Sequence, residues 1–462
     1  MRCRATKRRW SVSRGCCPTP TVCSTGPDAP REETTTVAAP LPNTQQAMRR
    51  RNLSLVLHAV AARGPLSRAA VAGEVGLTRA AVSTLVDELI RDGLLVELGP
   101  SRPGTVGRPG SALQLDERGP AGLGAEIGVD RLAVCAVDLR GRIRARTEIA
   151  AANRDRAPEP VLGQLADLVR TVAADAEGAG LRPVGLTVAV PGLVARGSSL
   201  VVRAPNLGWE SVDIGPGLRA ELPDLPLTVG NEANLGALAE LWRGGHDPEL
   251  RDFVHVSAEI GIGAAVVLDG RLLRGTRGFA GELGHVPVRP EGPECPCGGR
   301  GCLERYAGEE AVLRASGLSP EQAAAEHPGP GGRIALLAVR AAAGDRRVRR
   351  ALRDAGAALG IALAGTVNLL DPQKVVLGGA LTPLAPWLLP VLERELGRRV
   401  ADPARPGRET VTVSRLGAEG PLLGAAHSVV RAVLDDPAAF KDPGAAVGAR
   451  GNRAVDTARR RS

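Results

Sequence analysis

The sequence predicts an α/β protein in which a small helical domain precedes a larger domain built from two related lobes. From residue 52 onward, apolar residues recur at three- and four-residue spacing, as in amphipathic helices. Further along, a strand–turn–strand pattern occurs twice, and helices and strands follow each copy. At 462 residues the chain is also too long for one ordinary core. We therefore expect domains at residues 48–118 and 119–435.

Residues 1–47 and 436–462 are predicted to be disordered basic tails. The formal net charge of +9 is concentrated near the two ends of the chain, and its middle is close to neutral. Met48 is the only methionine after Met1 and immediately precedes RRRNLSLVL, where ordered sequence begins. Residues 1–47 are therefore interpreted as a dispensable extension or a wrongly chosen start. Basic tails can also contact nucleic acid, but solvated disorder is the simpler interpretation.

Residues 48–118 carry the pattern of a winged helix-turn-helix. Leu53, Val56, Leu57 and Val60 predict a first helix. Ser67 can then cap a short helix, SRAAVAGEV, after which Gly76 turns the chain. Thr78 can cap a second helix that ends at Gly93. In that helix we expect a buried stripe of Ala81, Leu85 and Leu89. A recognition helix presents its N-terminal residues to base edges, and the candidates here are Thr78, Arg79, Ser83 and Thr84.

Two short strands, at 94–98 and 112–115, are predicted to follow and to form the wing. Arg102 and Arg108 lie in the Pro- and Gly-rich segment between them, where they could enter a minor groove or contact phosphate. The arginines at 49–51 would add nonspecific attraction to DNA. The alternative is a small three-helix interaction domain, which would need neither the arginine-bearing wing nor both caps.

A cluster of metal-ligand residues lies between Gly281 and Arg305. The segment reads GELGH, then nine residues, then CPCGGRGC. Disulfides or coincidence are the alternatives, but an odd number of thiols, an interleaved histidine and a Gly-rich turn favour metal. Four protein ligands leave no open position for an activated water, so the expected ion is a structural Zn²⁺. The predicted ligands are His285, Cys295, Cys297 and Cys302.

The remaining cysteines and the hydropathy indicate the compartment. Cys135 lies in an apolar segment, and the other four are in the N-terminal tail without ligand spacing. This usage fits a reducing cytoplasm. No apolar run approaches the length of a membrane span, and the basic N-terminus lacks the apolar core of a secretory signal. We therefore expect a cytoplasmic protein with no membrane partner.

The two-lobed prediction rests on a repeated hairpin. Residues 125–143 are partly echoed by residues 258–272, each with a strand, a glycine-bearing turn and an apolar strand. A helix at 158–177 and a strand at 184–190 follow the first copy, and a helix at 348–370 and a strand at 374–378 follow the second. Glycine hairpins facing a cleft between lobes can cradle phosphates through backbone amides. Alone this signal is weak, because glycine also serves ordinary turns.

Together these motifs resemble the signature of the ROK family (repressors, open reading frames and sugar kinases). The zinc-cluster segment is the most specific match, and the resemblance covers about residues 48–435. It implies an actin-like, ribonuclease H-like sugar-kinase fold. The family's repressors carry a winged helix-turn-helix ending in a G-R-P wing, here residues 107–109. Further matching landmarks are PG at 191–192, PNLGW at 205–209, NEAN at 231–234, GG at 378–379 and LGAA at 423–426.

The resemblance also implies what a kinase of this family would need. Its first hairpin should read Asp-x-Gly-Gly-Thr, but residues 126–130 read EIGVD, so Val129 and Asp130 replace the second Gly and the Thr. Its second hairpin should read Gly-Thr-Gly-x-Gly, but residues 259–263 read EIGIG. The general base, normally Asp, is Glu232, whose longer side chain is misplaced for an Asp-shaped site. Phosphoryl transfer depends on positioning and electrostatics, and these replacements disturb both. We therefore expect that the protein is not an enzyme.

The sugar-binding side of the motif is better preserved. The positions that the resemblance assigns to hexose contacts all carry hydrogen-bonding side chains, which suit the hydroxyls of a sugar. The alternative is that they are ordinary surface or cap residues, a reading that weakens as their number grows. His285 has two roles in this interpretation, with one ring nitrogen on zinc and the other free for the ligand. The candidate ligand-binding residues are Asn206, Asn231, Glu232, Glu282, His285 and Glu304.

These observations predict a sugar-responsive transcriptional regulator, most simply a repressor. A small sugar or sugar phosphate would bind between the lobes and alter the spacing of two DNA-reading heads. The family and the two-fold symmetry of helix-turn-helix operators imply a homodimer or tetramer on palindromic operator DNA. Two alternatives remain: a DNA-bound regulator controlled by a protein partner, and an active ATP-dependent sugar kinase with a DNA-binding appendage.

Overall fold

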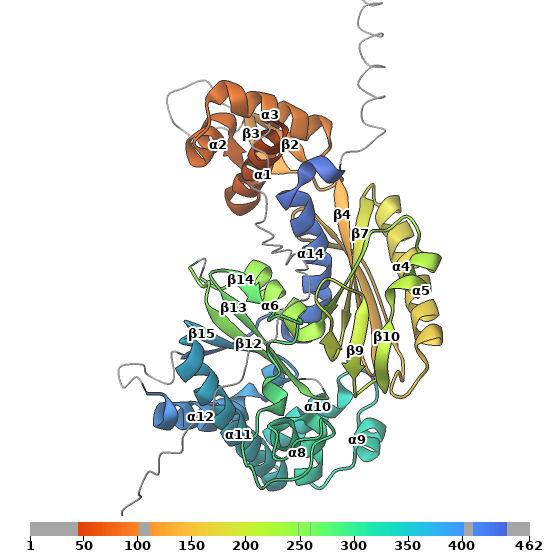
Figure 1. Cartoon of the computed structure of the whole chain (residues 1–462), viewed down its shortest axis with the longest axis vertical. Coiled ribbons are helices and arrows are strands. Elements are labelled where there is room, and N and C mark those ends of the chain that lie inside the picture. Colours follow the sequence, from red (N-terminus) through yellow and green to blue (C-terminus); the bar gives the residue numbers. More distant parts are fainter. Residues whose placement is uncertain (1–44, 101–110, 248, 259, 402–409, 441–462) are drawn as a thin grey trace, which may run out of the picture. The chain divides into compact units, whose positions relative to one another are not determined.

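The computed structural model describes residues 45–100, 111–247, 249–258, 260–401 and 410–440 (Figure 1). The chain divides into two compact units, Met1–Thr44 and Gln45–Ser462, and every described residue belongs to the second. Both predicted tails fall almost entirely outside the described residues. The first helix begins at Gln45, three residues before the predicted boundary.

The N-terminal part of the described chain contains three helices and a small antiparallel sheet of order β1-β3-β2. Both predicted caps are confirmed, because Ser67 Oγ accepts from Ala70 N and Thr78 Oγ1 accepts from Ala81 N, each at 3.2 Å. Gly76 turns the chain with φ of +68°. The elements are α1 (Gln45–Arg63), β1 (Leu66–Ser67), α2 (Arg68–Val75), α3 (Arg79–Arg91), β2 (Leu95–Pro100) and β3 (Ser111–Leu115).

The buried face of α3 differs from the prediction. Ala81 is exposed, and the buried apolar residues are Val82, Leu85, Val86 and Leu89. The helix turns its larger apolar side chains into the core and leaves the small Ala81 outside, because burying Val82 removes more apolar surface from water. Within the described residues no single helix is long and apolar enough to cross a membrane. Only α2 and α3 taken together, with a bend of 113°, pass a test of length and composition.

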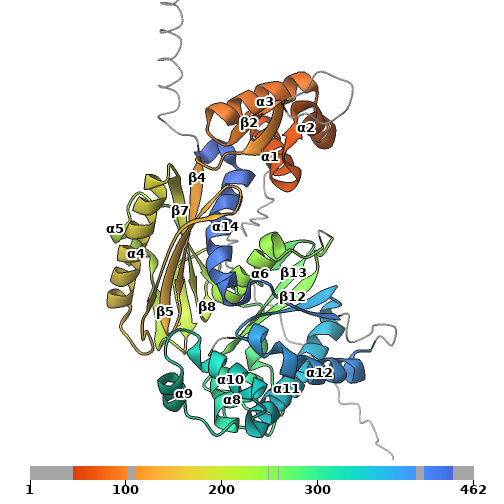
Figure 2. The same ribbon diagram turned by 180° about the vertical axis from the view of Figure 1, so that it is seen from behind.

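The first lobe is a five-stranded sheet of order β11-β7-β4-β5-β6. Helices α4 and α5 cover one face, and α14 lies against the other (Figures 1 and 2). A small antiparallel sheet of β8, β9 and β10 adjoins it. The bounds are β4 (Pro120–Ile127), β5 (Arg131–Asp138), β6 (Ile143–Ala150), α4 (Pro158–Gly178), β7 (Arg182–Val190), β8 (Leu193–Val194), β9 (Leu200–Ala204), β10 (Trp209–Asp213), α5 (Gly215–Glu221), β11 (Leu227–Asn231) and α14 (Gly420–Asp435).

The second lobe is a five-stranded sheet of order β14-β13-β12-β15-β16. One face packs against α11 and α12, and the other against α6, which also connects the lobes. The bounds are α6 (Glu232–Arg243), β12 (Phe253–Ala258), β13 (Ile262–Leu268), β14 (Arg271–Leu273), η1 (Leu283–His285), α7 (Glu304–Ala307), α8 (Glu309–Ala315), α9 (Pro320–Glu326), α10 (Gly332–Ala342), α11 (Arg346–Leu370), β15 (Lys374–Gly379), α12 (Leu381–Arg399), β16 (Val411–Val413), η2 (Gly417–Glu419) and η3 (Pro437–Phe440).

The two sheets have the same topology, which confirms the repeat predicted from the hairpins. In each lobe a central strand, β4 or β12, pairs antiparallel with the next strand, β5 or β13. On its other side it pairs parallel with β7 or β15, which pairs parallel with β11 or β16. The outer antiparallel strands, β6 and β14, also correspond. The helices predicted at 158–177 and 348–370 are α4 and α11.

The inner helices of the two lobes, α6 and α14, pack directly against each other. A Cβ on Gly424 would collide with the carbonyl oxygen of Leu235, so the two backbones approach closely at this glycine. Ala189, Leu235 and Ala425 form a small apolar cluster at the contact. The N-terminal end of α6 lies between the lobes, and this places its first residues at the site described next.

Gly124 provides a test of how closely α14 packs on the first sheet. A Cβ at this position would lie 2.5 Å from both Ala426 N and Leu422 O. Gly124→Ala should therefore destabilise the protein by about 1–3 kcal/mol, the usual cost of overpacking. The matched control is Gly163→Ala in α4, where a Cβ meets no atom within 4 Å and should stabilise the helix slightly. Urea denaturation of both variants measures the difference, and equal stabilities would contradict the packing.

Candidate ligand pocket and metal-binding cluster

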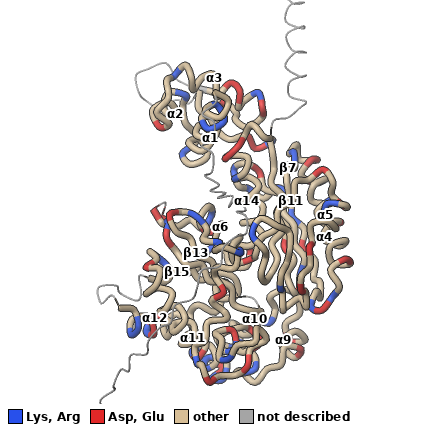
Figure 3. The backbone as a smooth tube through the Cα atoms, in the orientation of Figure 1, with Lys and Arg blue, Asp and Glu red and all other residues tan. Residues whose placement is uncertain are grey.

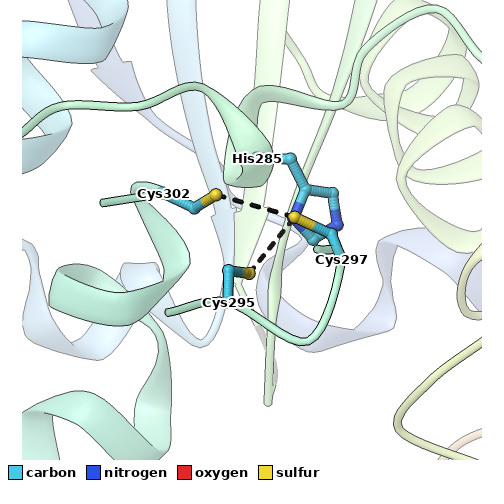
Figure 4. Close-up of side chains that lie close together, drawn as sticks. All are labelled: His285, Cys295, Cys297 and Cys302. Atoms are coloured by element: carbon cyan, nitrogen blue, oxygen red, sulfur yellow. Dashed lines mark hydrogen bonds between the residues drawn. The ribbon is translucent and has the colours of Figure 1, made fainter. Parts of the chain in front are cut away.

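The structure brings the four predicted metal ligands together. Their ligand atoms lie within 4.8 Å of one another (Figure 4). Cys297 Sγ lies 3.7 Å from Cys302 Sγ, and Cys295 Sγ lies 3.8 Å from His285 Nδ1. Ligands about 2.3 Å from a tetrahedral Zn²⁺ are separated by about 3.8 Å, so these spacings fit such an ion. Among the described cysteines none forms a disulfide. The cluster can hold a metal ion.

A glycine-rich turn gives the cluster its shape. Cys295 N donates to Gly299 O and Gly298 N donates to Cys295 O, both at 2.9 Å. Gly298 has φ of +93°, a conformation that L side chains rarely adopt. The Gly299 amide donates to Cys297 Sγ at 3.4 Å. The hydrogen bonds of the backbone alone therefore bring the three thiols close together.

All six predicted ligand-binding residues line one pocket of about 200 Å³ beside the cluster. Residues from both lobes line it. The first lobe contributes the loop after β9, with Asn206, and the end of β11, with Asn231. Glu232 opens α6. The second lobe contributes the turn before β13, the segment Glu282–His285 and the start of α7 at Glu304.

Gly261 shows how closely two of these side chains approach the second hairpin turn. A Cβ on Gly261 would lie 3.3 Å from Asn206 Nδ2 and would collide with the Glu304 carboxylate. Both polar groups therefore lie against the bare backbone of this turn. A glycine here leaves space for both side chains.

Asn231 forms two hydrogen bonds within the protein itself. Its Oδ1 accepts from Asn234 N at 3.0 Å and so caps α6, and its Nδ2 donates to Gly192 O at 2.9 Å. Asn231 therefore has the helix-capping role that was the alternative to ligand binding for these residues. At the pocket it fixes where Glu232 lies, and it retains the second Nδ2–H and the second lone pair of Oδ1 for a ligand.

Two carboxyl groups of this pocket, those of Glu232 and Glu282, resist ionisation. Burial, together with the nearby carboxyls of Glu126 and Glu282, raises the pKa of Glu232 to about 7, against the opposing charge of Arg131. Partial burial also raises the pKa of Glu282, and Glu304 adds to that shift while His285 opposes it. His285 Nε2 lies 3.8 Å from Glu282 Oε2, so the ring nitrogen turned away from Cys295 faces the pocket.

The sequence did not single out the arginines of this pocket. Arg154, in the loop before α4, pairs with Glu310 of α8 at 2.8 Å and so connects the two lobes across the pocket. Arg305 and Arg314 also line the pocket. No local motif marks Arg154, since its contact with Glu310 joins segments 156 positions apart.

A second pocket, of about 260 Å³, lies beside the first hairpin turn and includes Val129, Asp130 and Arg131. The polar groups of this turn contact the chain itself. Asp130 Oδ2 accepts from Gly331 N at 3.2 Å. Arg131 pairs with the buried Glu126 at 2.7 Å and donates to Ala418 O at 3.1 Å. A carboxylate and a branched side chain thus stand where a phosphate-binding turn needs small residues and free amides.

The candidate DNA-contacting residues on α3 lie where a ligand could reach them. Arg79 and Thr84 are exposed and Ser83 is half-buried. Thr84 Oγ1 donates to Ala80 O within its own helix at 3.2 Å. Arg102 and Arg108 lie outside the described residues. Thr78 is the helix cap already described, so its hydroxyl has a structural role as well.

Two of the arginines at 49–51, in α1, pair with carboxylates, and their attraction to DNA stays a prediction. Arg49 pairs with Glu88 of α3, and Arg50 pairs with Asp436, just beyond α14. His58 Nε2 also lies 2.7 Å from Asp435. Basic and acidic residues are accordingly mixed along α1, α2 and α3 (Figure 3). The pairs of Arg50 and His58 connect α1 to the C-terminal end of α14, and the pair of Arg49 connects α1 to α3.

Comparison with known proteins identifies the family of this chain. The model of the family described as "ROK family" matches residues 122–432. A xylose repressor of Caldicellulosiruptor bescii is 29% identical over 84% of this chain and 97% of its own length. The DNA-binding transcriptional dual regulator NagC of Escherichia coli is 28% identical over 71% of this chain and 80% of its own length.

Two solved structures share the fold. A ROK family transcriptional regulator, a homologue of the Escherichia coli MLC protein, aligns with a TM-score of 0.68 and 28% identity over 84% of this chain and 97% of its own. A ROK family glucokinase from Streptomyces griseus, in complex with glucose and AMPPNP, aligns with a TM-score of 0.55 and 26% identity over 67% of this chain and 98% of its own. The predicted ROK repressor and sugar-kinase fold is confirmed, and the winged helix-turn-helix stays a prediction.

The raised pKa of Glu232 predicts a pH-dependent stability. With its pKa near 7 in the folded protein and near 4.5 unfolded, this carboxyl binds more protons folded than unfolded between those values. Its contribution to stability therefore falls as the pH rises from 4.5 to 7. Glu232→Gln should raise Tm relative to wild type more at pH 8 than at pH 5. The exposed Glu210→Gln on β10 is the control, and a pH-independent Tm difference for Glu232→Gln would contradict the burial of its carboxyl.

Proposed function

The chain belongs to the ROK family, and we propose that it is a cytoplasmic, sugar-responsive transcriptional regulator that acts as a repressor. The main observation is the convergence of six hydrogen-bonding side chains from both lobes on one pocket. The named relatives that match most of its length are repressors. The proposal therefore joins a sugar site to a DNA-reading head in one chain.

The proposed DNA-reading head is the helix pair α2–α3 with the strands that follow. Thr78, Arg79, Ser83 and Thr84 would contact base edges or nearby phosphates from the N-terminal half of α3. Arg102 and Arg108 of the predicted wing would add contacts to the minor groove or the phosphate backbone. A homodimer would present two such heads to a palindromic operator, as two-fold symmetry requires.

The proposed effector is a sugar or sugar phosphate held between the lobes. Glu232, Glu282 and Glu304 offer carboxylate oxygens that accept hydrogen bonds from hydroxyls, and Asn206 offers an amide. His285 would donate or accept through the ring nitrogen that faces the pocket. Residues from both lobes would then touch one small molecule, so its binding would favour one separation of the lobes.

The proposed metal is a structural Zn²⁺ on His285, Cys295, Cys297 and Cys302. The ion would hold the glycine-rich turn in place and fix the tautomer and orientation of His285. Cys297 and His285 both line the ligand pocket. These two side chains would therefore bind the metal and shape the pocket at the same time.

The signal would travel through α6 and α14. Glu232 is the first residue of α6, α6 packs along α14, and the end of α14 reaches α1 through His58 with Asp435 and Arg50 with Asp436. A shift of α6 on ligand binding would displace α14 because Gly424 brings the two backbones together. The ion pairs at α1 would pass that displacement to the DNA-reading head.

Kinase activity is not part of this proposal. Asp130 places a carboxylate at the first hairpin turn, where a phosphate would meet a like charge, and its oxygen already accepts from Gly331. Kinases of the family share the fold of the larger domain, as the Streptomyces griseus enzyme does. The alternative of control by a protein partner has the same DNA-reading head and differs in leaving the pocket without an effector.

The central test joins pocket to output. Glu304→Ala removes a carboxylate from the pocket wall, so it should abolish sugar binding by calorimetry while leaving operator affinity without sugar near wild type. Arg79→Ala should instead lower discrimination between operator and random DNA by about 10-fold, the typical value of a base contact. The assay uses a sugar panel and fluorescence anisotropy. Phosphorylation of any sugar by wild type would overturn the repressor proposal, and sugar-insensitive DNA binding would favour the protein partner.

The metal proposal predicts about one zinc per purified chain. Cys297→Ser removes one thiolate and should lower zinc content and Tm together, because metal binding energy here is also folding energy. Cys135→Ser, at a buried cysteine outside the cluster, should leave the zinc content unchanged. Elemental analysis and thermal denaturation measure both quantities. A folded wild-type protein without metal would rule out the zinc.

The signal route predicts an uncoupled variant. Asp436→Asn weakens the ion pair with Arg50 and should reduce the sugar-induced change in operator affinity by about 5-fold, within the usual range of allosteric coupling. Its sugar affinity should stay near wild type, because Asp436 is not part of the pocket. Asp167→Asn, which breaks a surface pair with Arg170, is the control. Wild-type responsiveness of Asp436→Asn would exclude the Arg50–Asp436 pair from this route.

A further inference from the structure

A groove separate from the sugar pocket and the hairpin-turn pocket lies behind α6. It has a volume of about 290 Å³, at the lower limit of small-molecule sites. Its walls come from β7 and β11 on one side and from α6 and α14 on the other. Most of the lining is apolar and includes Val184, Leu186, Val229, Leu235, Leu238, Val429 and Phe440.

One polar side chain in this groove is buried without a complete set of partners. Asn234 is only 6% exposed, and its Oδ1 accepts no hydrogen bond from the described residues. A buried amide oxygen left unsatisfied costs about 1–3 kcal/mol, but only a hydrogen-bond donor such as water can satisfy it, so this atom does not identify the class of ligand. Thr187 and Thr228 also line the groove, with their hydroxyls 2.7 Å apart.

The groove carries positive charge and no carboxylate. Arg274, which follows β14, belongs to its lining and forms no ion pair with any described residue. Arg274 is exposed, so its guanidinium is accessible to an anion from solution. The sugar pocket, in contrast, has carboxylates, Glu232, Glu282 and Glu304, beside its arginines. The groove therefore suits a different class of molecule.

We propose that this groove is a second ligand site, which binds a small organic carboxylate with an apolar body. The carboxylate would pair with Arg274, and the hydrocarbon would cover the apolar walls. A sugar does not fit this chemistry, because its many hydroxyls would lie against Val and Leu side chains without partners. This proposal does not depend on the function of the sugar pocket.

The position of the groove gives such a ligand contact with both lobes. Arg274 belongs to the second lobe, whereas β7 and β11 belong to the first. Ser428, Ala432 and Phe440 come from α14 and the segment after it, the same segments that reach α1. A bound carboxylate would hold these elements together at a point that the sugar does not touch.

Calorimetry of the full chain with sodium hexanoate tests the site. Hexanoate should bind saturably at one site per chain, and sodium acetate, which lacks the apolar body, and hexan-1-ol, which lacks the charge, should bind much more weakly. Arg274→Gln should weaken hexanoate binding about 10-fold, the equivalent of about 1.4 kcal/mol for one charge-assisted contact. Arg277→Gln is the matched control, because Arg277 stacks on Phe279 and does not line the groove.

Ala432→Phe supplies an independent variant. Ala432 is exposed in the groove, so the larger side chain can fill it without entering the core and should abolish hexanoate binding. Glu304→Ala, in the sugar pocket, should leave hexanoate binding unchanged, which separates this site from the proposed function. Absent hexanoate binding, or binding retained in Ala432→Phe, would overturn the proposal. A changed association state of Ala432→Phe by light scattering would overturn it too, since a second copy would then occupy the groove.

Discussion

The contact between α6 and α14 is the constraint on which the rest of this architecture depends. Each sheet has one face covered by its own outer helices and must bury the other against something apolar. Helix α14 covers the inner face of the first sheet and α6 that of the second, and the two helices then pack on each other. Because Gly424 has no side chain, the backbones meet without a layer between them. The ligand pocket and the groove behind α6 both border this contact.

Features formed by residues close together in the chain were predictable from the sequence. The caps at Ser67 and Thr78, the turn at Gly76 and the metal-ligand cluster each depend on residues close together in the chain, so spacing alone identified them. The paired topology of the two sheets followed from the repeated hairpins. The six pocket residues came from the family resemblance, and the structure places them around one pocket. Their roles toward a ligand stay predictions.

Features that depend on distant partners were not predictable. Arg154 reaches Glu310 across the pocket, and Arg50 reaches Asp436 over 386 positions, so no spacing marks either pair. Arg49 and Arg50, expected to attract DNA, pair with carboxylates that come close only in the fold. The spacing of Ala81 predicts a buried position, but the helix buries the larger Val82 and leaves Ala81 exposed. The wing arginines lie outside the described residues.

The turn formed by Val129 and Asp130 has a consequence for how a signal would persist. An enzyme that phosphorylates its ligand depletes it, so occupancy depends on turnover and on the supply of nucleotide. A chain whose turn contacts its own Gly331 instead of a phosphate would leave the sugar chemically unchanged. Occupancy would then follow the free concentration of sugar alone and would reverse when the sugar is removed. Such a protein measures its ligand at equilibrium, without spending a nucleotide.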